Sequence, residues 1–306
     1  MKKSNTFIKL LLIFGVILTL VGGIIFTVAM TASKWDFSVL ASHLYQKKVV
    51  ELTEEQTEAV SKIKIEMSTA DVKIEYHDGQ KIIVEGFDVT NLKGKILRRF
   101  TTSVSNGELS VTLKREKSHI FSMGTSGDCD VTVKLPKEKV VDLSVDLSTG
   151  DVIIGEKGKD CKLGKIEIEQ STGDTKIEAN VECSSLDVDG STGDVFVNGN
   201  LKVNSLEVET STGELYINAE IEAQTIEVEL SSGKVVCGSF ITASKIDVET
   251  STGDVTLKLL GSRSEYNYSY EASTGESNIY PMQNAGATKT VRVTVSTGDI
   301  YIYFER

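Results

Sequence analysis

Apolar and polar residues alternate along most of the chain from residue 61 onward, and the alternation recurs about every 20 residues. Residues 206–234 show the repeat twice, as LEVETSTGELYI and then as IEVELSSGK. Alternation with a period of two is typical of strands that bury one face. A regular repeat of this length predicts units that bury their apolar sides only by stacking on their neighbours.

Each repeat, which we call a rung, contains three short alternating segments. In one rung these are Val195/Val197, Leu201/Val203 and Leu206/Val208, and only two or three residues separate them. Such short corners suit a coil wound around one axis better than a sandwich, whose hairpins would interrupt the register. The pattern predicts an all-β fold, a parallel β-solenoid (β-helix) of about 20 residues per rung with a triangular section.

In each rung the third strand ends in a Ser-Thr-Gly-Asp motif or a close variant, for example at Ser171–Asp174. We interpret the motif as a corner, because Gly accepts the positive φ that other residues resist. The Ser and Thr hydroxyls are expected to bond local backbone groups. No helix is predicted after the motif, so it is not interpreted as a phosphate-binding loop.

The N-terminus predicts a membrane segment. Residues 10–30 carry no charge, and a helix of this length is long enough to cross a hydrocarbon core of about 30 Å. Lysines precede the segment and favour a cytoplasmic N-terminus. A cleaved signal peptide is the alternative. The predicted parts are a cytoplasmic tail (1–9), a transmembrane helix (10–30), a stalk (31–60), an irregular N-terminal part of the solenoid (61–142) and regular repeats (143–306).

Candidate chemistry among the cysteines is sparse. The four cysteines have no paired spacing, and Cys183 and Cys237 fall at inward positions, where we interpret them as small core residues. No metal site, disulfide framework or cofactor is predicted. At the far end, large residues in 300–304 are expected to close the stack.

The segment LPKEKVVDLSVDLSTGDV at 135–152 and the repeated (S/T)-G-(D/E)-V corners resemble the bacterial putative-adhesin family, a β-solenoid domain of unknown function. The resemblance covers residues 61–306. It implies a surface protein of Firmicutes-like bacteria, sometimes encoded beside envelope-stress regulators. It supplies no functional residues.

The outward residues of the third strands are nearly all acidic. They are Glu167, Asp187, Glu207, Glu227 and Asp247 in one column, and Glu169, Asp189, Glu209, Glu229 and Glu249 in the next, and we call these ten residues the acidic ladder. Glu271 is expected to continue the second column. Neighbouring carboxylates about 4.8 Å apart repel by about 0.8 kcal/mol in water. The ladder either gathers divalent ions, cationic peptides or a basic partner, or is a solvated face that keeps sheets from pairing.

The other two faces differ. The second strands carry Lys162, Glu182, Lys202 and Glu222, whose alternating signs favour a self-neutralising structural role. The first strands carry an apolar patch, predicted to consist of the adjacent Phe196, Tyr216 and Val236, in a column expected to run on through Thr256 to Asn278 and Tyr301. The patch suits a partner contact or stacking on sugars, unless a loop covers it.

No enzyme is predicted, because the carboxylates form an even series without a distinguished pair or a loop-built cleft. The leading hypothesis is a membrane-anchored extracytoplasmic binding or scaffolding module. Its partner would be a cell-wall polymer, a cationic peptide or a membrane protein, and no nucleic acid. The alternative is an accessory protein of envelope-stress signalling that acts through membrane-protein partners.

Overall fold

The computed structural model describes residues 14–15, 18–19, 21–28, 31, 44–90, 94–115 and 130–305. These residues and their neighbours form two compact units. The smaller unit comprises 1–46, 88–99 and 115–127, and within it Val89 and Arg98 belong to an antiparallel strand pair. The predicted tail 1–9 and parts of the predicted segment 10–30 lie outside the described residues. Residues 21–28 are helical, and no helix in the described part of the chain is long and apolar enough to cross a membrane.

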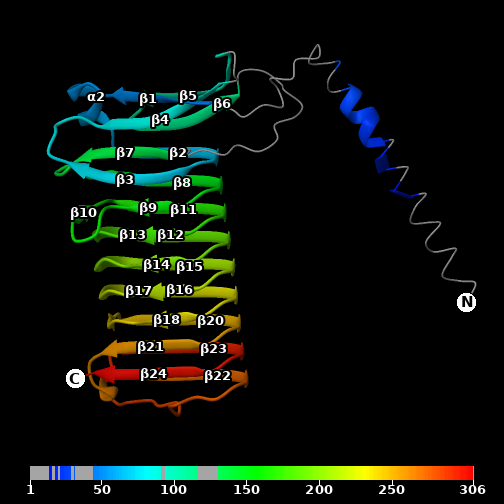
Figure 1. Cartoon of the computed structure of the whole chain (residues 1–306). Coiled ribbons are helices and arrows are strands. Elements are labelled where there is room, and N and C mark those ends of the chain that lie inside the picture. The colour runs from blue at the N-terminus through cyan, green and yellow to red at the C-terminus, as the bar shows by residue number, and fades with distance from the viewer. Residues whose placement is uncertain are drawn as a thin grey trace, which may run out of the picture. The chain divides into compact units, whose positions relative to one another are not determined.

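The larger unit, residues 47–87, 100–114 and 128–306, is a stack of parallel strands (Figure 1). One column of strands follows the corners. In spatial order it contains β7 (Asp130–Pro136), β3 (Asp71–His77), β9 (Val152–Ile154), β12 (Thr175–Ile177), β14 (Val195–Val197), β16 (Leu215–Ile217), β18 (Val235–Cys237), β21 (Val255–Leu260) and β24 (Ile300–Glu305).

A second column contains the strands that precede the corners. Its order is β6 (Glu108–Arg115), β2 (Lys62–Thr69), β8 (Asp142–Thr149), β11 (Lys165–Thr172), β13 (Asn180–Thr192), β15 (Leu201–Thr212), β17 (Ile221–Ser232), β20 (Lys245–Thr252), β23 (Lys289–Thr297) and β22 (Tyr266–Thr274). β13, β15 and β17 each join the predicted second and third strands. β10 (Asp160–Lys162) and β19 (Ile241–Thr242) supply the second strand separately.

The register of the regular rungs follows the sequence repeat. Leu206 pairs with Leu186 on one side and Ile226 on the other, so the step along the chain from one rung to the next is constant. These three side chains are at most 2% exposed. The predicted parallel pairing and inward columns are confirmed here, because alternation leaves each strand one apolar face and the stack buries it.

The order of rungs at the C-terminal end differs from the order along the chain. β23 lies between β20 and β22, and β24 pairs with β21. Residues 300–304 therefore lie in the last strand of one column, as expected, whereas β22 is the last strand of the other column. The chain leaves β21, passes through the 3-10 helix η2 (Arg263–Glu265) and forms the outermost strand β22 before returning to fill the gap.

Side chains and a loop cover the last rung. Backbone groups of Tyr268 and Met282 exchange hydrogen bonds of 3.0 and 2.9 Å. The Asn278 side chain accepts from the Ile302 N–H at 2.9 Å and donates to the Ile302 carbonyl at 3.1 Å, replacing a neighbouring strand. The ring of Phe304 packs 5.6 Å from that of Tyr268. These contacts protect an edge that could otherwise pair with another chain.

The opposite end is irregular. The described part of the predicted stalk forms β1 (Leu44–Glu51) and α2 (Glu54–Ala59), which begins with a capping box between Thr53 and Gln56. Leu52 and Val60 are buried. β4 (Ile83–Thr90) pairs antiparallel with β7, and β5 (Ile96–Ser105) leads to β6 through Asn106 and Gly107, both at positive φ. Antiparallel strands and a helix thus replace the repeat at this end.

Candidate binding faces

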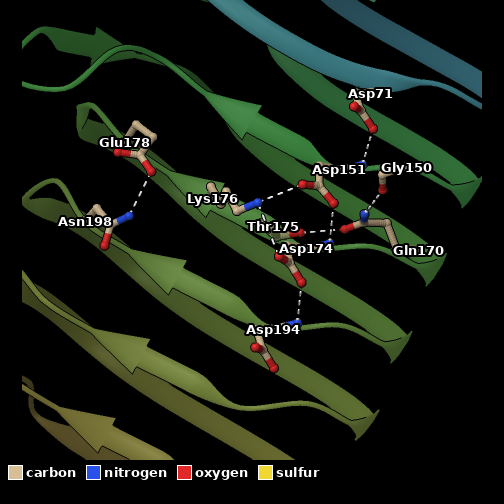
Figure 2. Close-up of polar contacts among 10 residues, drawn as sticks. All are labelled: Asp71, Gly150, Asp151, Gln170, Asp174, Thr175, Lys176, Glu178, Asp194 and Asn198. Atoms are coloured by element: carbon tan, nitrogen blue, oxygen red, sulfur yellow. Dashed lines mark hydrogen bonds and ion pairs between the residues drawn. The ribbon is translucent and has the colours of Figure 1, made fainter. Parts of the chain in front are cut away.

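At most corners an aspartate side chain bonds to the backbone of the neighbouring rung, as Figure 2 shows for Asp71, Asp151 and Asp174. Oδ1 of Asp151 accepts a 2.9 Å hydrogen bond from the Asp174 N–H, and Oδ1 of Asp174 accepts one of 3.0 Å from the Asp194 N–H. By contrast, Ser171 and Thr172 are exposed, and their hydroxyls form no hydrogen bond with other described residues. The predicted local bonding by corner hydroxyls is therefore wrong, because these side chains point to solvent and the Asp makes the bond instead.

The corner carboxylates are also compensated within the fold. Lys176 Nζ lies 2.7 Å from Asp151 and 3.2 Å from Asp174 (Figure 2). Burial opposes ionisation of Asp151, yet the hydrogen bonds from Lys176 and from the Asp174 N–H lower its pKa. Beneath the corner, Gln170 Nε2 donates to the Gly150 carbonyl at 2.6 Å. These polar groups hold rungs together and are not free for a ligand.

The ten residues of the acidic ladder lie in two in-register columns on one face. The registers are Glu167–Asp187–Glu207–Glu227–Asp247 and Glu169–Asp189–Glu209–Glu229–Glu249. All ten are exposed or half-buried. Adjacent strands in such a sheet are about 4.8 Å apart, so each carboxylate of the three middle rungs has like-charged neighbours above and below.

Cations stand only at the ends of the first column. Lys165 forms an ion pair with Glu167, and Lys245 Nζ lies 3.9 Å from Asp247, which is also in register with Arg292. The three middle rungs carry six ladder carboxylates, and none of these forms an ion pair with another described residue. They are Asp187, Asp189, Glu207, Glu209, Glu227 and Glu229. The uncompensated charge is therefore concentrated at the centre of the face.

The protonation of the middle rungs reflects this repulsion. The negative charge of Asp187 is the largest influence on Glu207, and together with partial burial and the carboxylates of Glu227 and Glu209 it raises the pKa of Glu207. Burial, with Glu167 and Asp189, raises the pKa of Asp187 although Lys165 opposes the shift. Both raised pKa values mean that ionising these carboxyls costs free energy, and a bound cation would reduce this cost.

The ladder differs from the prediction at its ends. Glu271 lies in the register of the second column as expected, but Thr294 separates it from Glu249, so the two carboxylates are not neighbours. At the other end Asp146 and then Glu66 extend it past Glu169, and the sequence interpretation missed both. A signal was present, because each stands two residues before a corner serine, as Glu169 does before Ser171.

The predicted apolar patch is present as a stack of side chains. The rings of Phe196 and Tyr216 are parallel within 4°, with centroids 5.2 Å apart, and Val236 follows in register. All three are half-buried. Because the rings face each other, one face of each is occupied and a sugar could stack only on an outer face. The order at the end of this column differs from the expected one. Tyr301 follows Thr256, and the parallel bridge between Ser277 and Ile300 places Asn278 beyond Tyr301.

Cys183 and Cys237 lie in the core as predicted, and Cys161 lies there too. Cys161, Cys183 and Cys237 are 2%, 8% and 1% exposed. Burial raises the pKa of Cys161 to about 11, and those of Cys183 and Cys237 to about 12.

In a Cys129→Ser variant at pH 8 we expect no reaction with Ellman's reagent until denaturant is added, because thiolate is the nucleophile and buried thiols are protonated. Rapid labelling of the native protein would contradict this burial.

Among the residues that the structure describes, no group of three or more His, Cys, Asp or Glu side chains could hold a metal ion.

Similarity to known proteins agrees with this fold. No curated protein matches the chain in sequence. A putative adhesin from Bacteroides fragilis NCTC 9343 matches in structure with a TM-score of 0.50 and 15% identity, over 84% of this chain and 97% of its own. One from Parabacteroides distasonis ATCC 8503 matches with a TM-score of 0.51 and 11% identity, over 84% and 97%. One from Parabacteroides merdae ATCC 43184 gives 0.50 and 14%, over 83% and 95%.

At these identities the three structures show a shared fold, and their names assign no reaction. The Toastrack DUF4097 family model matches residues 60–303, which contain nearly every strand of the stack. The chain belongs to the Toastrack DUF4097 family.

Proposed function

We propose that the protein is an extracytoplasmic binding module, anchored in the membrane by residues 10–30, that holds cationic partners on its acidic ladder. The absence of charge over residues 10–30 supports the anchor. The names of the structurally similar proteins, which are putative adhesins, support a place at the cell surface.

One observation carries the binding role: the six uncompensated carboxylates of β13, β15 and β17. Alternation of charge would have removed the repulsion, and the second-strand face has it, with Lys162 Nζ 3.1 Å from Glu182. An extended cationic peptide could lie along the two columns and contact several carboxylates at once. Such binding would draw on many weak contacts and would fall as salt increases.

The test is titration of the full-length protein in detergent with a lysine-rich peptide. In the triple variant Glu207→Gln/Glu227→Gln/Glu229→Gln we expect about tenfold weaker binding, since three exposed contacts of about 0.5 kcal/mol each are lost. Binding should also weaken as the pH falls from 7 to 4. The raised pKa values of Asp187 and Glu207 make these carboxyls lose charge at a higher pH than ordinary carboxyls do.

A matched control changes the net charge equally elsewhere. Glu55, Glu138 and Glu156 are exposed and lie outside the ladder. The variant Glu55→Gln/Glu138→Gln/Glu156→Gln should bind the peptide nearly as the wild type does. Equal loss in both variants would show that net charge alone attracts the peptide, and no loss in the ladder variant would reject the ladder as the binding face.

A further inference from the structure

The second-strand face carries a short column of exposed charges of alternating sign. Lys162, Glu182, Lys202 and Glu222 lie in register on consecutive rungs. Their side chains are 56–68% exposed. The pairs within the chain are Lys162 with Glu182 at 3.1 Å and Lys202 with Glu222 at 4.0 Å. Exposed pairs of this kind contribute little stability, so these charges can still interact with an external partner.

The order of the signs makes this column complementary to itself when reversed. In an antiparallel pair of chains Lys162 faces Glu222 of the second copy, and Glu182 faces Lys202. In a parallel pair related by a two-fold axis along the stack, every residue faces its own copy and all four contacts join like charges. The charge order therefore selects one orientation, as a self-complementary interface requires.

We propose that this face binds a second copy of the same chain in antiparallel orientation. The third-strand face cannot do so, because the acidic ladder opposes another ladder with negative charge in either orientation. The second-strand face is the one on which both signs alternate over four rungs. The occupant is thus identified by charge complementarity along the column.

The residues beside the column suit a hydrated contact. Ser184, Asn204 and Gln224 flank it on one side, with Asn180 and Asn200 on the other. Hollows of about 650 and 550 Å³ lie along the two flanks and can hold bridging water. The column that contains Asn180 and Asn200 has an acid at each end, Asp160 and Glu220. In the antiparallel pair Asp160 would face Glu220 of the second copy at the rim, where solvent and salt screen the repulsion.

The size of the face predicts a weak association. Four rungs spaced by about 4.8 Å and three columns spaced by about 7 Å cover about 400 Å² per copy. This is about half of a standard protein interface. The pair should form at high local concentration and should dissociate at high salt.

Antiparallel pairing has a geometric consequence for the cell surface. Each chain begins its stack at residue 47, so the two starting points lie at opposite ends of the pair. If both chains carry the anchor of the proposed function, on which this step rests, the pair joins two facing membranes. Two copies in one membrane would need the parallel orientation that the charges oppose.

Cross-linking between copies tests the orientation. Full-length Lys162→Cys and Glu222→Cys chains, each carrying Cys129→Ser, are mixed in detergent and treated with a short bis-maleimide. We expect the mixed product to exceed each homodimer about fivefold, because two copies of residue 162 would lie about three rungs, or about 14 Å, apart. A predominance of 162–162 cross-links would overturn the antiparallel arrangement, and the absence of all cross-links would overturn the pairing.

A charge exchange provides a second measurement. One variant, Lys162→Glu/Lys202→Glu, has an all-acidic column, and the other, Glu182→Lys/Glu222→Lys, has an all-basic column. Each should sediment as a monomer alone, and the mixture should form a heterodimer that about 0.5 M NaCl dissociates. A monomeric mixture would overturn the proposal. Peptide titration of both variants, whose ladders are intact, separates this failure from failure of the proposed function.

Discussion

Replacing Gly193 by alanine is expected to destabilise the stack strongly, because the corner glycines leave no room for an added methyl group. Gly193 has φ 146°, and an added Cβ would overlap the carbonyl oxygen of Gly173 in the neighbouring rung. Strained backbone costs about 1–3 kcal/mol and overpacking about 1–3 kcal/mol. We expect a loss of about 3 kcal/mol or more in the free energy of unfolding, measured by urea titration followed by circular dichroism.

The same rung supplies a control for this substitution. Gly190 has no positive φ, and the nearest atom to an added Cβ is 3.8 Å away, in the Thr210 side chain. Gly190→Ala should stabilise the protein by about 0.5–1 kcal/mol, because alanine restricts the unfolded chain and fits the native backbone. Equal destabilisation by both substitutions would show that the corner glycine has no special conformational role.

Deletion of residues 289–306 is expected to disrupt the C-terminal rungs. The deletion removes β23 from between β20 and β22, and β24 from its place against β21. It also removes five side chains that are at most 2% exposed: Val291, Val293, Val295, Ile300 and Ile302. Burial of each contributes about 1.5–3 kcal/mol, so the summed loss of about 7–15 kcal/mol rivals the stability of a whole domain.

The expected result is proteolysis of the chain after β20 at a protease concentration that leaves the wild type intact. Rungs contact mainly their neighbours, so earlier rungs such as β13 should stay protected. Two single substitutions in β23 grade the effect. Val293→Ala at a buried position should cost about 2 kcal/mol, and Arg292→Ala at an exposed one close to zero. Full protection of β22 in the deleted chain would contradict the strand order.

The regular part of the fold could be predicted from the sequence because two periods act together. Alternation assigns each side chain to the inside or the outside of a strand, and the constant step between rungs aligns equivalent positions. Glu207 could therefore be placed between Asp187 and Glu227 without coordinates. The same reasoning placed Phe196 beside Tyr216.

The prediction of neighbouring residues failed where segments one repeat apart in the sequence are not on adjacent rungs of the stack. Glu271 follows Glu249 at a spacing close to the repeat, yet β22 lies two rungs away because β23 intervenes. Glu66 and Asp146 are separated by several repeat lengths of sequence and are direct neighbours. Only long-range pairing at the ends of the stack decides these positions, and a local pattern carries no information about it.

The placement of β23 also affects when the protein can finish folding. Ribosomes deliver a chain from its N-terminus, and earlier segments begin to fold before later ones are made. Here β23 fills a place in the stack between two strands that are both synthesised before it. Until it arrives, β20 and β22 have no common neighbour, and their backbone groups face solvent. The nascent protein therefore carries an open insertion slot between β20 and β22 until β23 is made, and β23 acts as the closing segment.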